Sequence, residues 1–153
     1  MGEIKDRLQG ELTAAMRSKD ELRTATIRMA MAAIRTAEVA GTQARELSRD
    51  EEIAVLSKEA KKRREAAQAF RDGGREDRAA REDAEAAILA EYLPAPLTED
   101  ELAALVDTAI AETGATSPRD MGQVMKVLQP KVAGRAEGGT VAAAVKARLG
   151  PTS

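Results

Sequence analysis

Residues 91–101, with the sequence EYLPAPLTEDE, contain the sharpest break in the chain. Pro94 and Pro96 lack the backbone N–H that a helix needs, and each disfavours a helical conformation in the residue before it. Thr98 and Glu101 then have the spacing of a capping box, which predicts that a new helix begins directly afterwards. The sequence is therefore predicted to divide into a domain, a Pro-Ala-Pro linker and a second domain. Their ranges are residues 1–93, 94–96 and 97–153.

The composition indicates an all-α protein. Of the 153 residues, 32 are Ala and 33% are charged, whereas Phe70 and Tyr92 are the only aromatic residues. Alanine is the strongest helix former, and the alternating β-branched and aromatic residues that mark strands are missing. The predicted fold class is all-α, with an N-terminal antiparallel helical bundle followed by a small C-terminal three-helix domain.

Apolar residues at helical spacing predict four helices before the linker. Their expected ranges are about 3–18, 21–40, 48–71 and 76–93. Ser48 and Glu51 have the spacing of a capping box at the start of the third helix. The second helix is apolar on two sides, which predicts a central place in the packing.

The second domain has equally clear helix boundaries. Gly114 is expected to end its first helix. Ser117 and Pro118 are expected to begin the next helix, and Pro130 is expected to end it. An apolar stripe over residues 141–149 predicts the last helix.

The residues that the chain lacks exclude several kinds of chemistry. Without His and Cys there is no zinc site of the usual kind, no thiolate nucleophile and no imidazole base. Neither Gly-rich phosphate loop, G-x-x-x-x-G-K-[ST] or G-x-G-x-x-G, occurs. We therefore expect no catalysis by this chain alone, no cofactor and no metal. The charged N-terminus and the lack of long apolar runs predict a cytoplasmic protein that has no membrane partner.

Charge is distributed unevenly along the chain. Residues 1–97 carry 18 Lys and Arg against 19 Asp and Glu, residues 98–113 carry 0 against 5, and residues 114–153 carry 6 against 2. The net charges of these segments are −1, −5 and +4. A basic C-terminal segment favours an anionic partner, although a solvated surface would have the same composition.

The segment after Pro118 contains the most specific candidate site. Gly122 falls in the first turns of a predicted helix, where glycine costs about 1 kcal/mol relative to alanine. We therefore expect a ligand or a neighbouring helix to approach it closely. Gly134 lets the following loop turn sharply, with Lys131 and Arg135 beside it and a helix N-terminus just after. Such a loop suits a phosphate, and it equally suits a tight interhelical turn with two incidental cations.

Basic residues also gather in the third helix. The members of this run are Lys58, Lys61, Lys62, Arg63 and Arg64. Arg63 falls on the apolar stripe, so its stem is expected to pack while its guanidinium reaches a carboxylate of a neighbouring helix or a bound anion. The other cations indicate either a solvated helix face or a second contact with RNA.

At these positions the sequence resembles the stand-alone YqeY branch of the GatB/YqeY family. The resemblance rests on DMGQVMK over residues 120–126, PKVAGRAEGG over residues 130–139, EYLP over residues 91–94 and the K-K-R of the third helix. It extends from about Ile4 to Leu149. The same module forms the tail of the GatB subunit of the glutamine-dependent tRNA amidotransferase, where it contacts tRNA. One departure is the turn at residues 137–139, Glu-Gly-Gly, where an Asp-Gly type is expected, which puts the cap of the last helix in doubt.

The resemblance implies a non-catalytic accessory module that binds tRNA or another RNA. The kinase step and glutamine hydrolysis of the amidotransferase belong to other parts of that complex. Carbon–nitrogen ligase activity with glutamine as amide donor is therefore only a family-level association. The positions implied for RNA binding are Gly122, Lys126, Lys131, Gly134 and Arg135, with Lys61 and Arg63 as secondary candidates. The basic charge of residues 114–153 adds Lys146 as a further phosphate contact.

Two functions remain open. In the first, the basic C-terminal domain holds the phosphates of tRNA or another structured RNA and reads its shape, because two aromatic residues are too few for base stacking. In the second, the bundle is a protein–protein interaction adaptor that binds no nucleic acid. Amidotransferase or synthetase components are the partners that this adaptor would dock on.

Overall fold

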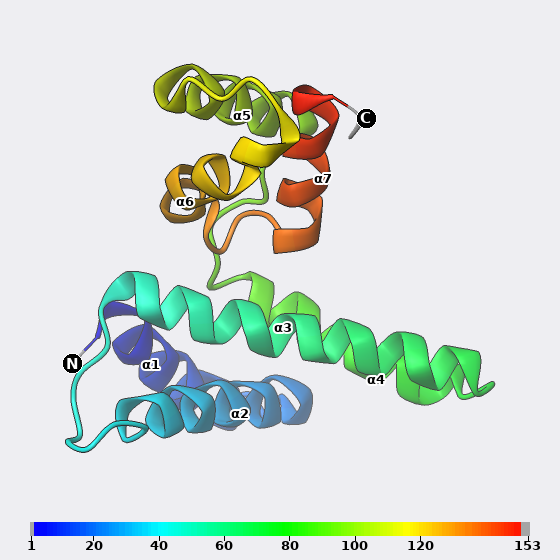
Figure 1. The fold of residues 1–153 in the computed structure, drawn as a ribbon. Coiled ribbons are helices and arrows are strands. Elements are labelled where there is room, and N and C mark those ends of the chain that lie inside the picture. The colour runs from blue at the N-terminus through cyan, green and yellow to red at the C-terminus, as the bar shows by residue number, and fades with distance from the viewer. Residues whose placement is uncertain (1, 151–153) are drawn as a thin grey trace. The chain divides into compact units, whose positions relative to one another are not determined.

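The computed structural model describes residues 2–150, whose regular elements are all helical (Figure 1). The elements are α1 Glu3–Arg17, α2 Glu21–Glu38, α3 Arg49–Asp72, α4 Glu76–Ala90, α5 Glu99–Thr113, the 3₁₀ turn η1 Pro118–Asp120, α6 Met121–Val132 and α7 Gly138–Leu149. The all-α prediction is confirmed. The chain divides into two compact units, Met1–Pro94 and Ala95–Ser153. Within the described range, each helix is too short or too polar to cross a lipid bilayer.

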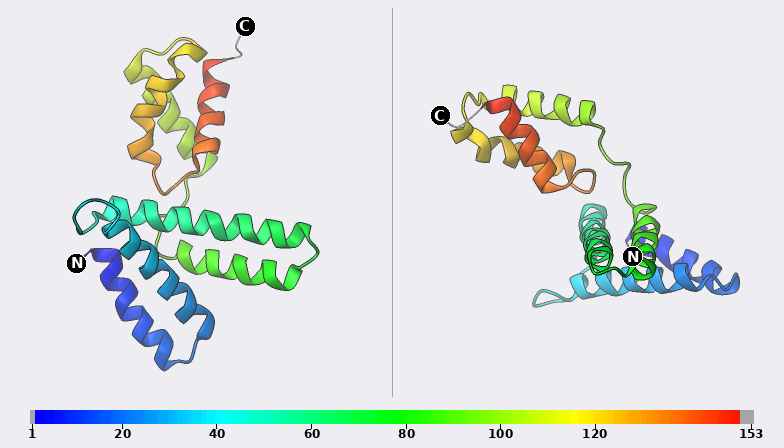
Figure 2. Two further views of the ribbon diagram at one scale, coloured as in Figure 1. Left: turned by 60° about the horizontal axis from the view of Figure 1, so that its bottom comes forward. Right: turned by 90° about the vertical axis from the view of Figure 1, so that its right-hand side faces the viewer.

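The N-terminal unit consists of two helical hairpins, α1–α2 and α3–α4, that cross each other (Figure 2). Helix α2 packs against α1, α3 and α4. The fully buried leucine and isoleucine residues between the hairpins are Leu8, Ile27, Ile34, Leu56 and Leu89. Because burying one such side chain contributes about 1.5–3 kcal/mol, aliphatic contacts supply most of the stability of this unit.

The N-terminus of α1 is capped by a carboxylate from another helix. Glu52 of α3 is 1% exposed and accepts hydrogen bonds from the backbone N–H of Ile4 at 3.3 Å and of Lys5 at 2.8 Å. The carboxylate thus satisfies two donors at the helix start and lies at the positive end of the helix dipole. Gly2 permits this contact, because a Cβ at that position would collide with the Glu52 carboxylate.

The predicted capping box of α3 is present. The Glu51 N–H donates to Ser48 Oγ at 3.2 Å, and the Ser48 N–H donates to Glu51 Oε1 at 3.0 Å. Hydrogen bonds from the Arg45 guanidinium and then from the Ser48 N–H lower the pKa of Glu51 to about 2. The folded protein therefore favours the charged form of this carboxylate.

The lowered pKa of Glu51 predicts that the start of α3 weakens in acid. Because this pKa lies below the unfolded value of about 4.3, the stabilisation is complete above about pH 5 and is lost as the pH falls toward 2. We expect Glu51→Gln to flatten the pH dependence of the free energy of unfolding between these limits, as measured by urea denaturation. An equally steep dependence in this variant would contradict the assignment.

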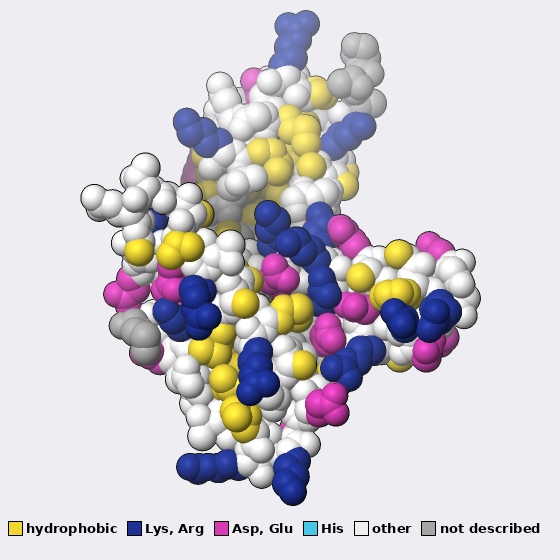
Figure 3. Space-filling view, turned by 90° about the horizontal axis from the view of Figure 1, so that it is seen from below, with side chains coloured by type: hydrophobic (Ala, Val, Ile, Leu, Met, Phe, Trp, Pro, Cys, Tyr) yellow, Lys and Arg dark blue, Asp and Glu magenta, His cyan; other side chains and the backbone are white. Residues whose placement is uncertain are grey.

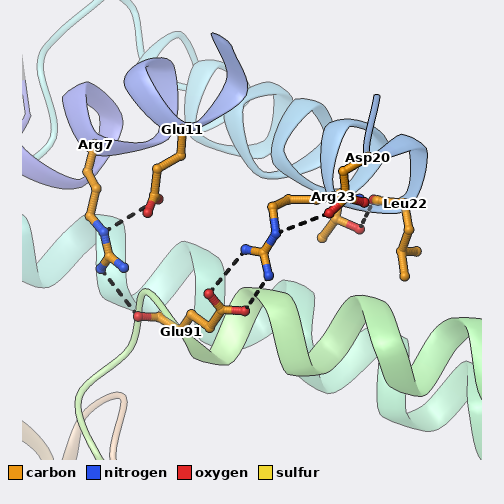
Figure 4. Close-up of polar contacts among 7 residues, drawn as sticks. Arg7, Glu11, Asp20, Leu22, Arg23 and Glu91 are labelled. Atoms are coloured by element: carbon orange, nitrogen blue, oxygen red, sulfur yellow. Dashed lines mark hydrogen bonds and ion pairs between the residues drawn. The ribbon is translucent and has the colours of Figure 1, made fainter. Parts of the chain in front are cut away.

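The end of α4 is fastened to the α1–α2 hairpin. The Glu91 carboxylate accepts two hydrogen bonds from the Arg23 guanidinium at 2.9 and 3.1 Å, and the Glu91 carbonyl accepts one from Arg7 at 3.2 Å (Figure 4). The Arg7 guanidinium also lies 4.4 Å from the centre of the Tyr92 ring, within the range of a cation–π interaction. Burial raises the pKa of Tyr92, and the Glu11 carboxylate raises it further. These contacts fix the point at which the chain leaves the N-terminal unit.

The C-terminal unit is a small domain of α5, α6 and α7 built on valine and leucine. Its fully buried valine and leucine residues are Val106, Leu128, Val124, Val141 and Val145. The predicted capping box at Thr98 and Glu101 is present, with both hydrogen bonds between 3.1 and 3.2 Å. Gly114 ends α5 as predicted, with a φ of +69° that favours glycine.

One predicted helix boundary in this unit is wrong. The sequence predicts that Pro130 ends its helix, but α6 continues to Val132, which is buried. Proline in a last turn removes one hydrogen bond, and the burial of Val132 compensates for that loss. The predicted start is present, because Ser117 is the N-cap residue and Pro118 begins the 3₁₀ turn η1, which leads directly into α6 at Met121. Helix α7 begins at Gly138, and the side chain of its N-cap residue, Glu137, makes no capping hydrogen bond.

Candidate nucleic-acid interface

Helices α6 and α7 contain no carboxylate. Each is 12 residues long, and together they carry four exposed cations. These are Lys126, Lys131, Lys146 and Arg148. The compact unit, however, also includes the acidic helix α5, so residues 95–153 carry 6 Lys and Arg against 7 Asp and Glu, a net charge of −1. The expectation of a basic C-terminal domain is therefore corrected: the charge of +4 belongs to residues 114–153, and the basic surface belongs to two helices of a weakly acidic unit.

Three carboxylates of α5 face three cations of the same unit. The pairs are Lys131 with Glu112 at 3.6 Å, Arg135 with Glu101 at 3.5 Å and Arg148 with Asp107 at 3.2 Å. Each side chain in these pairs is about a third to a half exposed. Such pairs contribute only about 0–1 kcal/mol, so an incoming phosphate can replace the carboxylate. Sequence reasoning misses these pairs, because no local signal tells which cation a distant carboxylate meets.

Gly134 and Arg135 form a tight turn that is tied to the start of the C-terminal unit. Gly134 has a φ of +76°, in the left-handed region that favours glycine. Arg135 Nε donates to the carbonyl of Ala95 at 3.0 Å, and the Arg135 carbonyl accepts from the Leu97 N–H at 2.9 Å. This is the geometry of the interhelical turn that the sequence left open as an alternative. Arg135 thus holds the loop after α6 and is not a free cation.

Lys126 and Lys146 face solvent without a carboxylate partner in residues 2–150. Lys126 lies five positions before Lys131, which is about 140° around the helix and away from Glu112. Lys146 lies two positions before Arg148, about 160° around α7 and away from the ion pair with α5. The two lysines that remain free are therefore on the sides of α6 and α7 that are turned away from the α5 carboxylates.

Gly122 shares the exposed side of α6 with Lys126, one helical turn away. No atom of the described chain, apart from its immediate neighbours and its own helix backbone, lies within 4 Å of the place where a Cβ would stand. Of the two neighbours expected at Gly122, a ligand or a helix, the described chain therefore supplies no helix. The space beside it is open, and a partner molecule can reach the backbone there.

The secondary candidates lie on different sides of α3. Arg63 Nη1 is 3.2 Å from Glu82 Oε2 of α4, and its side chain is 25% exposed. Of the two partners predicted for the Arg63 guanidinium, a carboxylate of a neighbouring helix or a bound anion, the structure shows the carboxylate. Lys61 faces solvent and lies 4.0 Å from Glu65. The structure therefore does not bring these two residues together, and both belong to the N-terminal unit.

The match to a known protein family covers residues of both units. The chain matches the family model described as Yqey-like protein over residues 5–149. No curated protein matches the sequence. The matched range contains every candidate residue named above and leaves out only four residues at each end. The chain therefore belongs to the YqeY family.

Proposed function

We propose that this protein binds tRNA or another structured RNA through α6 and α7 and has no catalytic activity of its own. The observation that carries the proposal is that these two helices combine four exposed cations with no carboxylate. Along the sides of α6 and α7 that bear Lys126 and Lys146, turned away from the α5 carboxylates, a phosphate backbone meets positive charge, and each neutralised phosphate releases bound counterions.

The residues of this surface have different roles in the proposal. Lys126 and Lys146 are the central phosphate contacts, because no carboxylate of the described chain competes for them. Lys131 joins when a phosphate displaces its exposed partner. Gly122 lets the RNA backbone come close to α6. Arg135, together with the left-handed Gly134, positions the loop and contacts RNA only secondarily.

Recognition in this proposal depends on RNA shape and backbone. Both aromatic residues, Phe70 and Tyr92, belong to the N-terminal unit, and Tyr92 is 4% exposed. The C-terminal unit therefore offers no ring on which a base can stack. Structured RNA presents phosphates and 2′-hydroxyl groups in a regular helical arrangement that cations can follow.

The family relation suggests the setting of this activity. We place the protein in the cytoplasm, beside the glutamine-dependent amidation of aminoacyl-tRNA. Its role there is that of an accessory RNA-binding protein and not that of the carbon–nitrogen ligase. Amidotransferase or synthetase components are then neighbours on the same tRNA.

A mobility-shift titration with unfractionated tRNA tests the proposal. We expect the tRNA to be retarded by the full chain, and we expect competition by heparin, another polyanion. A parallel purification from lysate, with and without nuclease, separates RNA binding from the adaptor alternative. Complexes lost on nuclease treatment agree with the proposal, whereas complexes that persist while tRNA fails to bind would overturn it.

Gly122 gives a test in which stability and binding change in opposite directions. Gly122→Ala meets open space, so we expect the free protein to gain up to about 1 kcal/mol from helix propensity. The affinity of this variant for tRNA should fall, because the added methyl group occupies the space through which RNA approaches the backbone. Gly10→Ala in α1 is the matched control, since Gly10 also lies in a helix beside open space. That variant should gain stability and bind tRNA like the parent; equal binding by both variants would remove Gly122 from the interface.

A further inference from the structure

The outer side of α2 forms a second surface, which the RNA proposal does not use. Its exposed residues follow one side of the helix, and Met16 of α1 lies beside them. The members of this surface, called the α2 surface below, are Met16, Ala25, Arg28, Ala32, Arg35 and Val39. Met16 and Val39 are 51% and 58% exposed. Among residues 2–150, no other large hydrophobic residue is as exposed as these two.

The α2 surface is positive as well as apolar. The sequence has no carboxylate between Glu21 and Glu38, although it has three arginines there. Arg23 pairs with Glu91 of the N-terminal unit and is used by the fold. Arg28 Nη2 lies 3.8 Å from Met16 Sδ, and neither Arg28 nor Arg35 meets a carboxylate of the described chain. Figure 3 views the N-terminal unit from the side on which α2 lies. Basic and hydrophobic side chains lie next to one another on that face.

We propose that the α2 surface binds an acidic amphipathic helix of a partner protein. Arg28 and Arg35 are seven residues apart, about 10.5 Å along the helix, which matches two carboxylates at the same spacing on a partner helix. Alanine at positions 25 and 32 lets the two helix backbones approach closely. A nucleic acid backbone would satisfy the arginines but would leave Met16 and Val39 without apolar contacts, so the combination of charges and apolar side chains favours a protein helix.

Site-specific photo-cross-linking tests this proposal on the full chain. The exposed Thr36, which borders the α2 surface and leaves Ala25 and Ala32 unchanged, is replaced by p-benzoyl-phenylalanine, with the exposed Ala87 of α4 as the matched control position. After irradiation in a lysate of the source cells, the cross-linked segment is sequenced by mass spectrometry. We expect a segment from a helix with carboxylates seven residues apart beside apolar residues, and we expect the product to survive nuclease. A cross-link to RNA, a segment without that pattern, or no product above the Ala87 control would overturn the proposal.

Charge reversal identifies the arginines as the specific contacts. The expected result is that Arg28→Glu combined with Arg35→Glu lowers the affinity for a peptide of the cross-linked segment by about tenfold at low salt. A peptide in which the two carboxylates are replaced by lysine should regain binding to this variant. Equal affinity of the parent and the charge-reversed protein would overturn the proposal. Binding of tRNA is expected to be unchanged, so failure here is distinguishable from failure of the RNA function.

Discussion

Glu52→Ala should lower the free energy of unfolding by about 2–3 kcal/mol. The substitution leaves the backbone N–H groups of Ile4 and Lys5 without their acceptor at a position where Glu52 is 1% exposed. It also removes a negative charge from the N-terminus of α1. The folded protein no longer has to desolvate a buried carboxylate in this variant, which offsets part of the loss. The expected decrease in the free energy of unfolding is therefore smaller than the sum of the contributions of the two hydrogen bonds. Urea denaturation followed by circular dichroism gives the free energy.

Two further variants show whether the capping contact is the cause. Glu65→Ala removes an exposed carboxylate from the same helix and should change stability by less than about 0.5 kcal/mol. Glu52→Gln keeps one acceptor oxygen and loses the charge, so it should lie between the alanine variant and the parent. A Glu52→Ala protein as stable as the Glu65→Ala protein would contradict the role of Glu52.

Lys126→Ala combined with Lys146→Ala should reduce tRNA affinity by about tenfold at low salt. The slope of log affinity against log salt concentration should fall by the amount expected for about two phosphate contacts. Both side chains are exposed and lack a carboxylate partner within residues 2–150, so their loss should leave the fold intact. A filter-binding titration gives the affinity, and circular dichroism verifies the fold.

The matched control for this double variant lies on the other unit. Arg28→Ala combined with Arg35→Ala removes the same amount of charge from exposed positions of α2 and should leave tRNA binding unchanged. Arg135→Ala should instead lower stability, because it removes the contacts to Ala95 and Glu101. If both double variants weakened tRNA binding equally, the interface could not be assigned to α6 and α7.

Local signals in the sequence predict the helix boundaries well. Ser48 and Thr98 open capping boxes, and Gly114 adopts the left-handed conformation that ends α5. These features depend on residues within one or two turns, so the sequence contains all the information needed. The error at Pro130 has the opposite origin: Val132 is buried against the other helices of its unit, and that tertiary contact extends α6 past the proline.

The candidate site was harder to predict because its charges interact over long distances. Residues 114–153 read as a basic segment, but α5 lies in the same unit and pairs with Lys131, Arg135 and Arg148. The cap supplied by Glu52 is separated from its donors by 47 and 48 positions, and Arg23 meets Glu91 across 68 positions. Such pairings follow from the packing of the hairpins, which no spacing rule describes.

The affinity of the full chain for unfractionated tRNA at about 50 and 200 mM salt tests the central claim most directly. Two or three neutralised phosphates predict that the affinity falls by about ten- to a hundredfold between these concentrations. The double variant at Lys126 and Lys146 should abolish most of this fall. No binding at the lower salt concentration, or an affinity that does not depend on salt, would contradict the assignment of α6 and α7 as an RNA-binding surface.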